Sequence, residues 1–226
     1  MSDADALWSL LLDYFHDRDI PLVSYHHMSP PWEEAPSVGI RADGFPDDWV
    51  CRYINEKLFL IDPIPEFALR STRPFFWSEA VQLTGLVAEQ HAFLGSLAES
   101  GIGDGLAVQV FGPAGRNGYF GLGFGERHRA VSPEAIAEFQ MICQAGHLRY
   151  CELVPQAPTP SLSQREREVL EWIARGKSNA VIGRILDVSH HTVDAYLRRI
   201  FSKLNVADRR TAVIKGIGSG LVRGDV

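Results

Sequence analysis

Two aromatic side chains and one carboxylate lie close together in residues 45–77, FPDDWVCRYINEKLFLIDPIPEFALRSTRPFFW. Trp49 and Tyr53 are four residues apart, so they share one face of a helix. Asp62 follows four apolar residues and precedes Pro63-Ile64, and a carboxylate in apolar surroundings needs a hydrogen-bond donor. A ligand with an N–H group would be such a donor. Capping of a helix that begins after Asp62 would satisfy the carboxylate as well, with the aromatic side chains as ordinary core, and the residues alone favour this second interpretation.

A second group of polar side chains lies on one face of a helix predicted over residues 190–204. At about 100° per residue, one narrow apolar stripe contains Val193, Leu197, Ile200 and Leu204. The opposite face carries His191, Asp194, Ala195, Arg198 and Ser202. Side chains of this kind can hydrogen-bond to a partner across an exposed helix face.

Capping residues and tight turns predict two further helices before this one. Ser163 and Glu166 are spaced as a capping box at the start of a helix that Gly176 ends. Ser178 can cap a second, shorter helix, and Asp187-Val188-Ser189 is a tight turn before the third. A short helix, a tight turn and a helix with one buried and one polar face predict a helix-turn-helix. The alternative is a small three-helix bundle with a solvated face.

The two parts of the chain carry opposite net charge. Residues 161–226 contain 12 Lys and Arg against 7 Asp and Glu, a net charge of +5, and residues 1–160 contain 10 against 21, a net charge of −11. The overall charge of −6 therefore hides a basic module joined to an acidic one. A basic surface is the electrostatic feature expected of a DNA-binding domain, so it supports DNA binding by residues 161–226 and not by the acidic part.

Composition narrows the class of protein further. No run approaches the 18 or so consecutive apolar residues of a membrane span, and the acidic start MSDADALWSLLLDYF predicts an amphipathic helix rather than a signal peptide. Cys51, Cys143 and Cys151 are odd in number, widely spaced and without metal-ligand neighbours. This pattern favours buried, reduced thiols in a cytoplasmic protein without a metal site.

Residues 155–160, PQAPTP, mark a domain boundary, because three prolines in six residues exclude helix and favour a short extended linker. We expect one domain over residues 1–154 and an all-α domain over residues 161–226. Before the linker, helices are predicted at about residues 4–17, 46–59, 63–71, 84–100 and 132–153, and strands at 21–27, 75–77, 106–111 and 119–124.

A hairpin is predicted between the last two strands, because GPAG at residues 112–115 and Asn117-Gly118 are turn signals. Gly121 and Gly123 leave the second of these strands without bulk on one face, which happens where a ligand or another backbone comes close. An antiparallel sheet covered by helices follows from this pattern, so the first domain is expected to be α+β.

The C-terminal residues LSQREREVLEWIARGKSNAVIG and VSHHTVDAYLRRIFSKLNV resemble the LuxR-type DNA-binding domain almost position by position. The resemblance implies that the third helix enters the major groove of double-stranded DNA. Base edges would face Asp194, Ala195 and Arg198, with His191 nearby. Phosphate contacts would come from Lys177, Ser178, Thr192, Arg199 and Lys203. Arg198 would recognise a guanine through two hydrogen bonds from its planar guanidinium. Asp194 would either accept a hydrogen bond from a cytosine amine or orient Arg198 through an i,i+4 pair.

The N-terminal part resembles the autoinducer-binding domain of LuxR-type quorum-sensing regulators. The positions that match in order and spacing are Trp49, Tyr53, Asp62-Pro63, Trp77 and Gly105. The resemblance implies an α-β-α sandwich that binds an N-acyl homoserine lactone and needs no other cofactor. By analogy, the Trp49 indole would donate to the lactone carbonyl and Asp62 would accept from the ligand amide. Tyr53 would line the acyl end near the amide, and Trp77 would pack against the lactone ring.

Two positions depart from the family pattern. Phe45 stands where many members carry a Tyr that helps hold the amide region, and Gly121 replaces a Ser or Thr on the hairpin strand. Both changes make the part of the pocket that would hold the ligand amide less polar. Because glycine also opens space, a bulky, branched or aromatic acyl group would fit, and the candidates for its lining, or for ordinary core, are Tyr25, Phe75 and Phe111.

The whole chain is therefore expected to be a ligand-responsive transcriptional regulator. It would bind an N-acyl homoserine lactone, form a homodimer with a contribution from a final helix at about residues 208–221, and bind a palindromic DNA site. RNA polymerase is a further expected partner, and a membrane is not. The alternative is a LuxR-type regulator that responds to a non-lactone molecule or acts without ligand. An enzyme is disfavoured because the sequence has no evident nucleophile–base pair or metal-ligand spacing.

Overall fold

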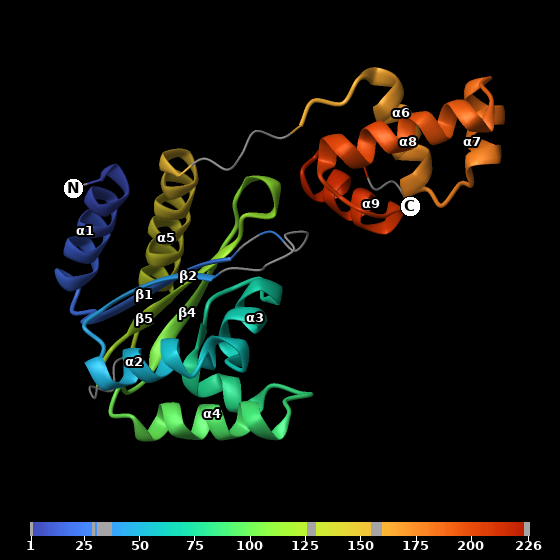
Figure 1. Cartoon of the computed structure of the whole chain (residues 1–226). Helices are drawn as coiled ribbons and strands as arrows, with labels where there is room; N and C mark the ends of the chain where they lie inside the picture. The colour runs from blue at the N-terminus through green and yellow to red at the C-terminus, as the bar shows by residue number, and fades with distance from the viewer. Residues whose placement is uncertain (1, 29, 31–37, 126–129, 155–159, 224–226) are drawn as a thin grey trace. The chain divides into compact units, whose positions relative to one another are not determined.

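The computed structural model describes residues 2–28, 30, 38–125, 130–154 and 160–223, which form two compact units (Figure 1). The helices of the first unit are α1 (Asp3–His16), α2 (Asp47–Asn55), α3 (Pro63–Arg70), α4 (Ala88–Glu99) and α5 (Pro133–Leu153). Its 3-10 turns are η1 (Leu58–Leu60) and η2 (Trp77–Gln82), and a further turn, η3 (Pro113–Gly115), lies between β4 and β5 in the sequence. Its strands are β1 (Leu22–Met28), β2 (Val38–Asp43), β3 (Phe75–Phe76), β4 (Gly105–Val110) and β5 (Gly118–Gly123).

An antiparallel five-stranded sheet forms the centre of this unit, in the order β2-β1-β5-β4-β3. The predicted hairpin is confirmed, because β4 pairs with β5 from Gly105 opposite Gly123 to Val110 opposite Gly118. The edge strand β2 is absent from the predicted strands. Its signal is a short alternation in which Ile40 and Ala42 are separated by Arg41, and this pattern is too brief to stand out from a loop.

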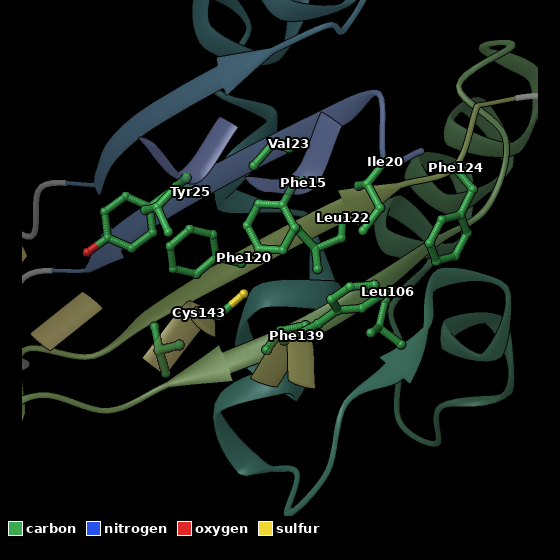
Figure 2. Packing of buried hydrophobic residues seen from close by; sticks show 13 residues of the cluster. Phe15, Ile20, Val23, Tyr25, Leu106, Phe120, Leu122, Phe124, Phe139 and Cys143 are labelled. Carbon is green, nitrogen blue, oxygen red and sulfur yellow. The ribbon is translucent and has the colours of Figure 1, made fainter. Parts of the chain in front are cut away.

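Helices cover both faces of the sheet, with α1 and α5 on one side and α2, α3 and α4 on the other (Figure 1). Beneath α1 and α5, a buried apolar cluster includes Phe15, Val23, Phe120 and Phe139 (Figure 2). The other face carries a second cluster that contains Trp49, Tyr53, Trp77 and Phe93. The α-β-α sandwich expected of the first domain is therefore confirmed.

Two predicted helices have different bounds, each for a local backbone reason. The helix predicted at 46–59 ends at Asn55, because Lys57 adopts the left-handed conformation (φ 54°) and the chain continues as η1. The helix predicted at 84–100 begins only at Ala88, since Gly85 has a φ of +83°. The prediction that all three cysteines are buried is wrong. Cys143 and Cys151 are buried, but Cys51 is exposed, on the face of α2 away from Trp49 and Tyr53.

The second unit consists of helices α6 (Gln164–Ala174), α7 (Asn179–Leu186), α8 (His190–Leu204) and α9 (Arg209–Gly218). The predicted caps are confirmed: Ser163 and Glu166 form the capping box, and Ser178 and Ser189 accept from backbone amides of α7 and α8. The predicted stripe of α8 is fully buried in one core with α6, α7 and α9. The helix-turn-helix prediction is therefore confirmed.

Among the described residues, none of the helices is both long and apolar enough to cross a membrane. The predicted linker lies largely at residues 155–159, outside the described residues, so the boundary between the two domains stays a prediction.

Candidate ligand pocket and nucleic-acid interface

A cavity of about 190 Å³ lies between the sheet and helices α2, α3 and α4 of the first unit. Most of its lining is apolar or aromatic, from Ile40, Ala42, Phe45, Trp49, Val50, Ile54, Ile64, Trp77, Phe93 and Leu97. Polar groups come from Ser24, His26, Tyr53, Asp62 and Tyr119. An apolar cavity with a few placed polar groups is the usual form of a small-molecule site.

Asp62 has two roles in the structure. At the N-cap of α3, its Oδ1 accepts from the backbone N–H of Ile64 at 2.9 Å, which confirms the capping interpretation. Its Oδ2 accepts from the Tyr53 hydroxyl at 2.8 Å, and the carboxylate also lines the cavity. Burial raises the pKa of Asp62 to about 6, although the bonds from Ile64 and Tyr53 act in the opposite direction.

The two tryptophans of the cavity differ in their indole N–H groups. Trp77 donates its Nε1–H to the Tyr119 hydroxyl at 2.9 Å, so this donor is already engaged within the protein. Trp49 is equally buried but makes no hydrogen bond to any residue in the described part of the chain. Because Trp49 lines the cavity and its N–H has no partner among the described residues, this donor is available to a ligand.

The glycines of β4 and β5 lie under the Trp77 ring and do not open space. A Cβ atom on Gly105 would come within 2.6 Å of Trp77 ring carbons. A Cβ atom on Gly121 would come within 2.6 Å of Ser24 Oγ and 2.9 Å of the Tyr119 hydroxyl. The prediction that Gly121 makes room for a bulky acyl group is therefore wrong, because protein side chains fill that room.

None of the three candidates for an acyl-tail lining is among the cavity residues, and the alternative of ordinary core is confirmed for Tyr25 and Phe75. Tyr25 points to the opposite face of the sheet, Phe75 packs against Phe67, and Phe111 is 45% exposed. The polar side chains Ser24 and His26 line the cavity without having been predicted to do so. The signal was present: alternate residues of a strand share a face, but nothing in the sequence shows which face meets the cavity.

In the second unit, the polar face of α8 is accessible. His191, Arg198 and Arg199 are exposed, and Thr192, Asp194 and Ala195 are half-buried. Lys177 and Ser178, just before α7, are exposed as well. The structure thus places most of the predicted base-facing and phosphate-facing side chains on α8 and at the start of α7.

Asp194 does not orient Arg198, which corrects one of the two predicted roles. Its Oδ1 accepts from the Asn179 side-chain amide at 2.6 Å, and no ion pair with Arg198 is found among the described residues. Asn179 in turn accepts from Arg209 at 2.7 Å. Asp194 is therefore held by the start of α7, and α9 supports that contact through Arg209.

Lys203, a predicted phosphate contact, is also engaged in the structure. Its ammonium lies 2.7 Å from Glu166 Oε2, and Glu166 is only 3% exposed. The pKa of Glu166 is lowered: burial acts to raise it, but the hydrogen bonds from Lys203 and from Ser163 outweigh that effect. The pair joins the capping box of α6 to α8, a role that spacing within either helix does not indicate.

A ligand-sized cavity in an α-β-α sandwich, together with a helix-turn-helix unit, defines the class of transcriptional regulators that bind a small molecule and DNA. Comparison with known proteins agrees with this class. Residues 3–150 match the autoinducer binding domain, and residues 160–215 match the bacterial regulatory proteins of the luxR family. This chain therefore belongs to the luxR family and is a LuxR-type quorum-sensing transcriptional regulator with an autoinducer-binding domain.

Individual relatives support the assignment along most of the chain. The transcriptional activator SolR of Ralstonia solanacearum is 31% identical over 199 residues, which cover 83% of this chain and 79% of SolR. The quorum sensing-dependent transcriptional regulator RpaR of Rhodopseudomonas palustris is 29% identical over 184 residues, 80% of this chain and 74% of RpaR. A crystal structure of Escherichia coli SdiA shares the fold, with a TM-score of 0.75 at 20% identity over 98% of this chain and 92% of SdiA.

Proposed function

We propose that the cavity of the first unit binds an N-acyl homoserine lactone and that the protein then binds a palindromic DNA site as a homodimer. The observation that carries the proposal is the pairing of a free donor with an acceptor in one cavity. The Trp49 indole N–H has no partner among the described residues, and the Asp62 carboxylate lines the same space. A lactone carbonyl and an amide N–H are complementary to these two groups.

The other predicted ligand residues divide into those that line the cavity and those that shape it. Phe45, Tyr53 and Trp77 lie in the lining, where Phe45 presents an apolar surface and the Trp77 ring can pack against the lactone. Gly105 and Gly121 contribute indirectly, because their missing side chains allow the Trp77 ring to lie against the sheet. Both glycines are therefore assigned to the position of Trp77 and not to direct contact with the ligand.

Ligand binding would act on DNA binding through stability and assembly. A ligand that binds only the folded state stabilises it, by about 2.7 kcal/mol at ~100-fold excess over the dissociation constant. A dimer would present two α8 helices to half-sites about one helical turn apart. Ile214 and Ile217 of α9 are 45% and 41% exposed, which supports the proposed contribution of this helix to the dimer contact.

The proposed DNA contacts follow the exposed side chains of α8. Arg198 would bind a guanine edge, with His191, Asp194 and Ala195 nearby on the same helix. Phosphate contacts would come from Lys177, Ser178, Thr192 and Arg199. Lys203 is left out of this set, because its ammonium is engaged by the buried Glu166.

The test is the melting temperature of the protein purified without ligand and titrated with acyl homoserine lactones. A panel of straight, branched, aromatic and hydroxylated acyl groups is used, and a rise of several degrees with at least one of them is expected. Asp62→Asn should reduce the rise, because asparagine can still cap α3 but its amide is a weaker acceptor than a carboxylate. Asp48→Asn, at an exposed position of α2, is the matched control and should respond as the wild type does.

The second candidate is a regulator of the same type with a non-lactone ligand. SdiA, which shares the fold, has been solved in complex with octanoyl-rac-glycerol, a molecule without a lactone ring. If no lactone shifts the melting temperature and mass spectrometry of denatured protein finds no retained lactone, the lactone proposal is wrong. The proposal that the second unit binds DNA would then still hold, but a lactone would not control it.

A further inference from the structure

Two polar side chains on one face of β1 line the cavity without a hydrogen-bond partner in the protein. Ser24 is 8% exposed and His26 is 5% exposed. Neither side chain forms a hydrogen bond to any residue within the described ranges. Because buried polar groups in folded proteins are almost always satisfied, each of these two needs a partner in the cavity.

Neither of the two tyrosines next to His26 forms a hydrogen bond with it. Its ring lies edge-on to Tyr53 and Tyr119, with centroid distances of 5.8 Å and 5.2 Å. The Tyr53 hydroxyl donates to Asp62, and the Tyr119 hydroxyl accepts from Trp77. The Tyr53 and Tyr119 hydroxyls are thus bonded to Asp62 and Trp77, and their rings meet the imidazole at steep interplanar angles of 82° and 71°.

The ionisation of His26 determines what it can bind. Burial lowers the pKa of His26 to about 4, so the imidazole is neutral near pH 7. A neutral imidazole has one N–H donor and one nitrogen acceptor. A hydroxyl group, which is both donor and acceptor, is complementary to it.

Ser24 lines the cavity from the same face of β1, at a different position. It is paired with Gly121 across the β1–β5 ladder, and its Oγ occupies the space that a side chain on residue 121 would take, next to the Trp77 ring. Ser24 and His26 are two residues apart on one strand, so their Cα atoms are separated by about 6–7 Å. The cavity therefore has one polar position near Trp77 and a second one further along β1.

The polar end of the ligand is assigned to Trp49, Asp62 and Trp77, with Ser24 and the Tyr119 hydroxyl beside Trp77. The surfaces that would surround an acyl chain come from apolar side chains of β2, α2, α3 and α4, namely Ile40, Val50, Ile54, Ile64, Phe93 and Leu97. His26 lies beside Tyr53 and Tyr119, further along β1 than Ser24, and adds a polar group to this lining. If the acyl chain has no oxygen, the imidazole nitrogens of His26 stay buried without a hydrogen-bond partner, and this lowers the affinity for the ligand.

We propose that His26 recognises an oxygen on the acyl part of the ligand, so that this protein prefers an acyl homoserine lactone whose acyl group carries a hydroxyl several bonds beyond the amide. Ser24 then binds the amide carbonyl. This inference rests on the proposed function, since it assigns the lactone end to Trp49, Asp62 and Trp77. Sites built to hydrogen-bond a hydroxyl discriminate strongly against the analogue that lacks it.

The experiment compares pairs of lactones with acyl groups of equal length, one with a hydroxyl toward the far end and one without. Dissociation constants are measured by calorimetry for the wild type, His26→Leu and His26→Gln. The wild type should prefer the hydroxylated member by about 10- to 100-fold. His26→Leu should abolish this preference while it still binds the unsubstituted member, and His26→Gln, which keeps a donor and an acceptor, should retain part of it.

His27→Leu is the matched control, because His27 is the next residue of β1 and points to the other face, where its ring meets Tyr150. It should keep the full preference for the hydroxylated lactone. Equal affinities of the wild type for both members would overturn the role of His26 and leave the lactone proposal intact, as would a preference that persists in His26→Leu. If His26→Leu does not fold, His26→Phe, which also lacks a donor and an acceptor, replaces it under the same criterion. If neither member of any pair binds, the proposed function fails and this inference fails with it.

Discussion

The hydroxyl of Tyr53 donates to Asp62 Oδ2 at 2.8 Å and so joins α2 to the first turn of α3 beside the cavity. The second carboxylate oxygen is bound by the backbone N–H of Ile64. The carboxylate is therefore fixed in position before any ligand is present. An acceptor held in place by two donors needs little reorganisation when a ligand amide reaches it, which favours binding.

Ligand affinity is expected to fall at low pH because of Asp62. The carboxyl has a pKa raised to about 6 by burial, and only its ionised form accepts fully from an amide N–H. We expect the dissociation constant of the lactone to be about tenfold higher at pH 5 than at pH 7, which calorimetry at the two values measures. Asp62→Asn should show little of this dependence. An equal pH dependence in the wild type and in Asp62→Asn would contradict the assignment.

The contribution of Asp62 to the unfolding free energy of the ligand-free protein should change in the opposite direction and increase as the pH falls. Burial raises the pKa of Asp62 in the folded state above the ordinary value of an aspartate, so the folded state binds the proton more tightly than the unfolded chain does. The stabilisation from this group is complete below the unfolded value and is lost as the pH rises through about 6. The difference in unfolding free energy between the wild type and Asp62→Asn should therefore shift in favour of the wild type between pH 7 and pH 5. A difference that does not change over this range would contradict the raised pKa.

Gly105 and Gly121 should differ in how they respond to substitution. Gly105→Ala would place a methyl group within 2.6 Å of the rigid Trp77 ring, whereas Gly121→Ala would meet the small Ser24 hydroxyl at the same distance. We expect each substitution to destabilise the fold by about 1–3 kcal/mol in urea unfolding. Adding Ser24→Ala should recover part of the loss in Gly121→Ala and none of it in Gly105→Ala. Equal recovery in both would show that the crowding is not local to Ser24.

The fold was largely predictable because its signals are local. Ser163, Ser178 and Ser189 cap the helices that they were expected to cap, and the buried stripe of α8 follows from helical periodicity alone. The capping role of Asp62 was predictable for the same reason: the residues involved are neighbours in the chain.

The finer parts of both candidate sites depend on contacts between residues far apart in sequence. Asp194 is bound by Asn179, fifteen residues away, rather than by Arg198 on its own helix. Lys203 is bound by Glu166 across 37 residues. Neither partner has a spacing that helical or strand periodicity can reveal, because both depend on how α6, α7 and α8 pack together.

Arg198 and Arg199 should have different effects on DNA binding. Both are exposed on α8, but Arg198 lies on the polar face opposite the buried stripe, where base edges are expected. Arg198→Ala should relax specificity at one base position by ~1–3 kcal/mol, and Arg199→Ala should weaken binding to all sequences and reduce the salt dependence by about one phosphate contact. Competition binding with single-base variants at two salt concentrations measures both effects. A uniform loss for Arg198→Ala would identify it as a phosphate contact instead.

Arg116 should be important for the stability of the first unit. The side chain is 4% exposed, and its guanidinium donates to the carbonyl oxygens of Cys151 and Val154 at 2.8 Å and 2.7 Å, at the C-terminal end of α5. Helix carbonyls at this end have no partner within the helix, and a cation there is also favoured by the helix dipole.

A buried histidine fixes the backbone of Arg116 as well. His147 Nε2 lies 2.8 Å from the Arg116 carbonyl oxygen, and His147 Nδ1 lies 2.8 Å from the Tyr25 hydroxyl. Because a carbonyl can only accept, Nε2 carries the proton and Nδ1 accepts from Tyr25. Burial lowers the pKa of His147, which is consistent with this neutral form near pH 7. The hairpin, α5 and β1 are thus joined through one continuous set of hydrogen bonds.

Arg116→Met is therefore expected to lower the unfolding free energy by about 2–4 kcal/mol, because it leaves helix carbonyls without donors in a buried place. Arg116→Lys should recover only a small part of the lost unfolding free energy, since an ammonium group cannot reproduce the planar guanidinium that donates to two carbonyl oxygens. Urea unfolding of the ligand-free protein measures both variants. Arg149→Met is the control: Arg149 pairs with Glu152 on the surface of the same helix, and loss of an exposed pair should change stability by less than about 1 kcal/mol. Equal effects of Arg116→Met and Arg149→Met would show that the buried guanidinium does not stabilise the end of α5.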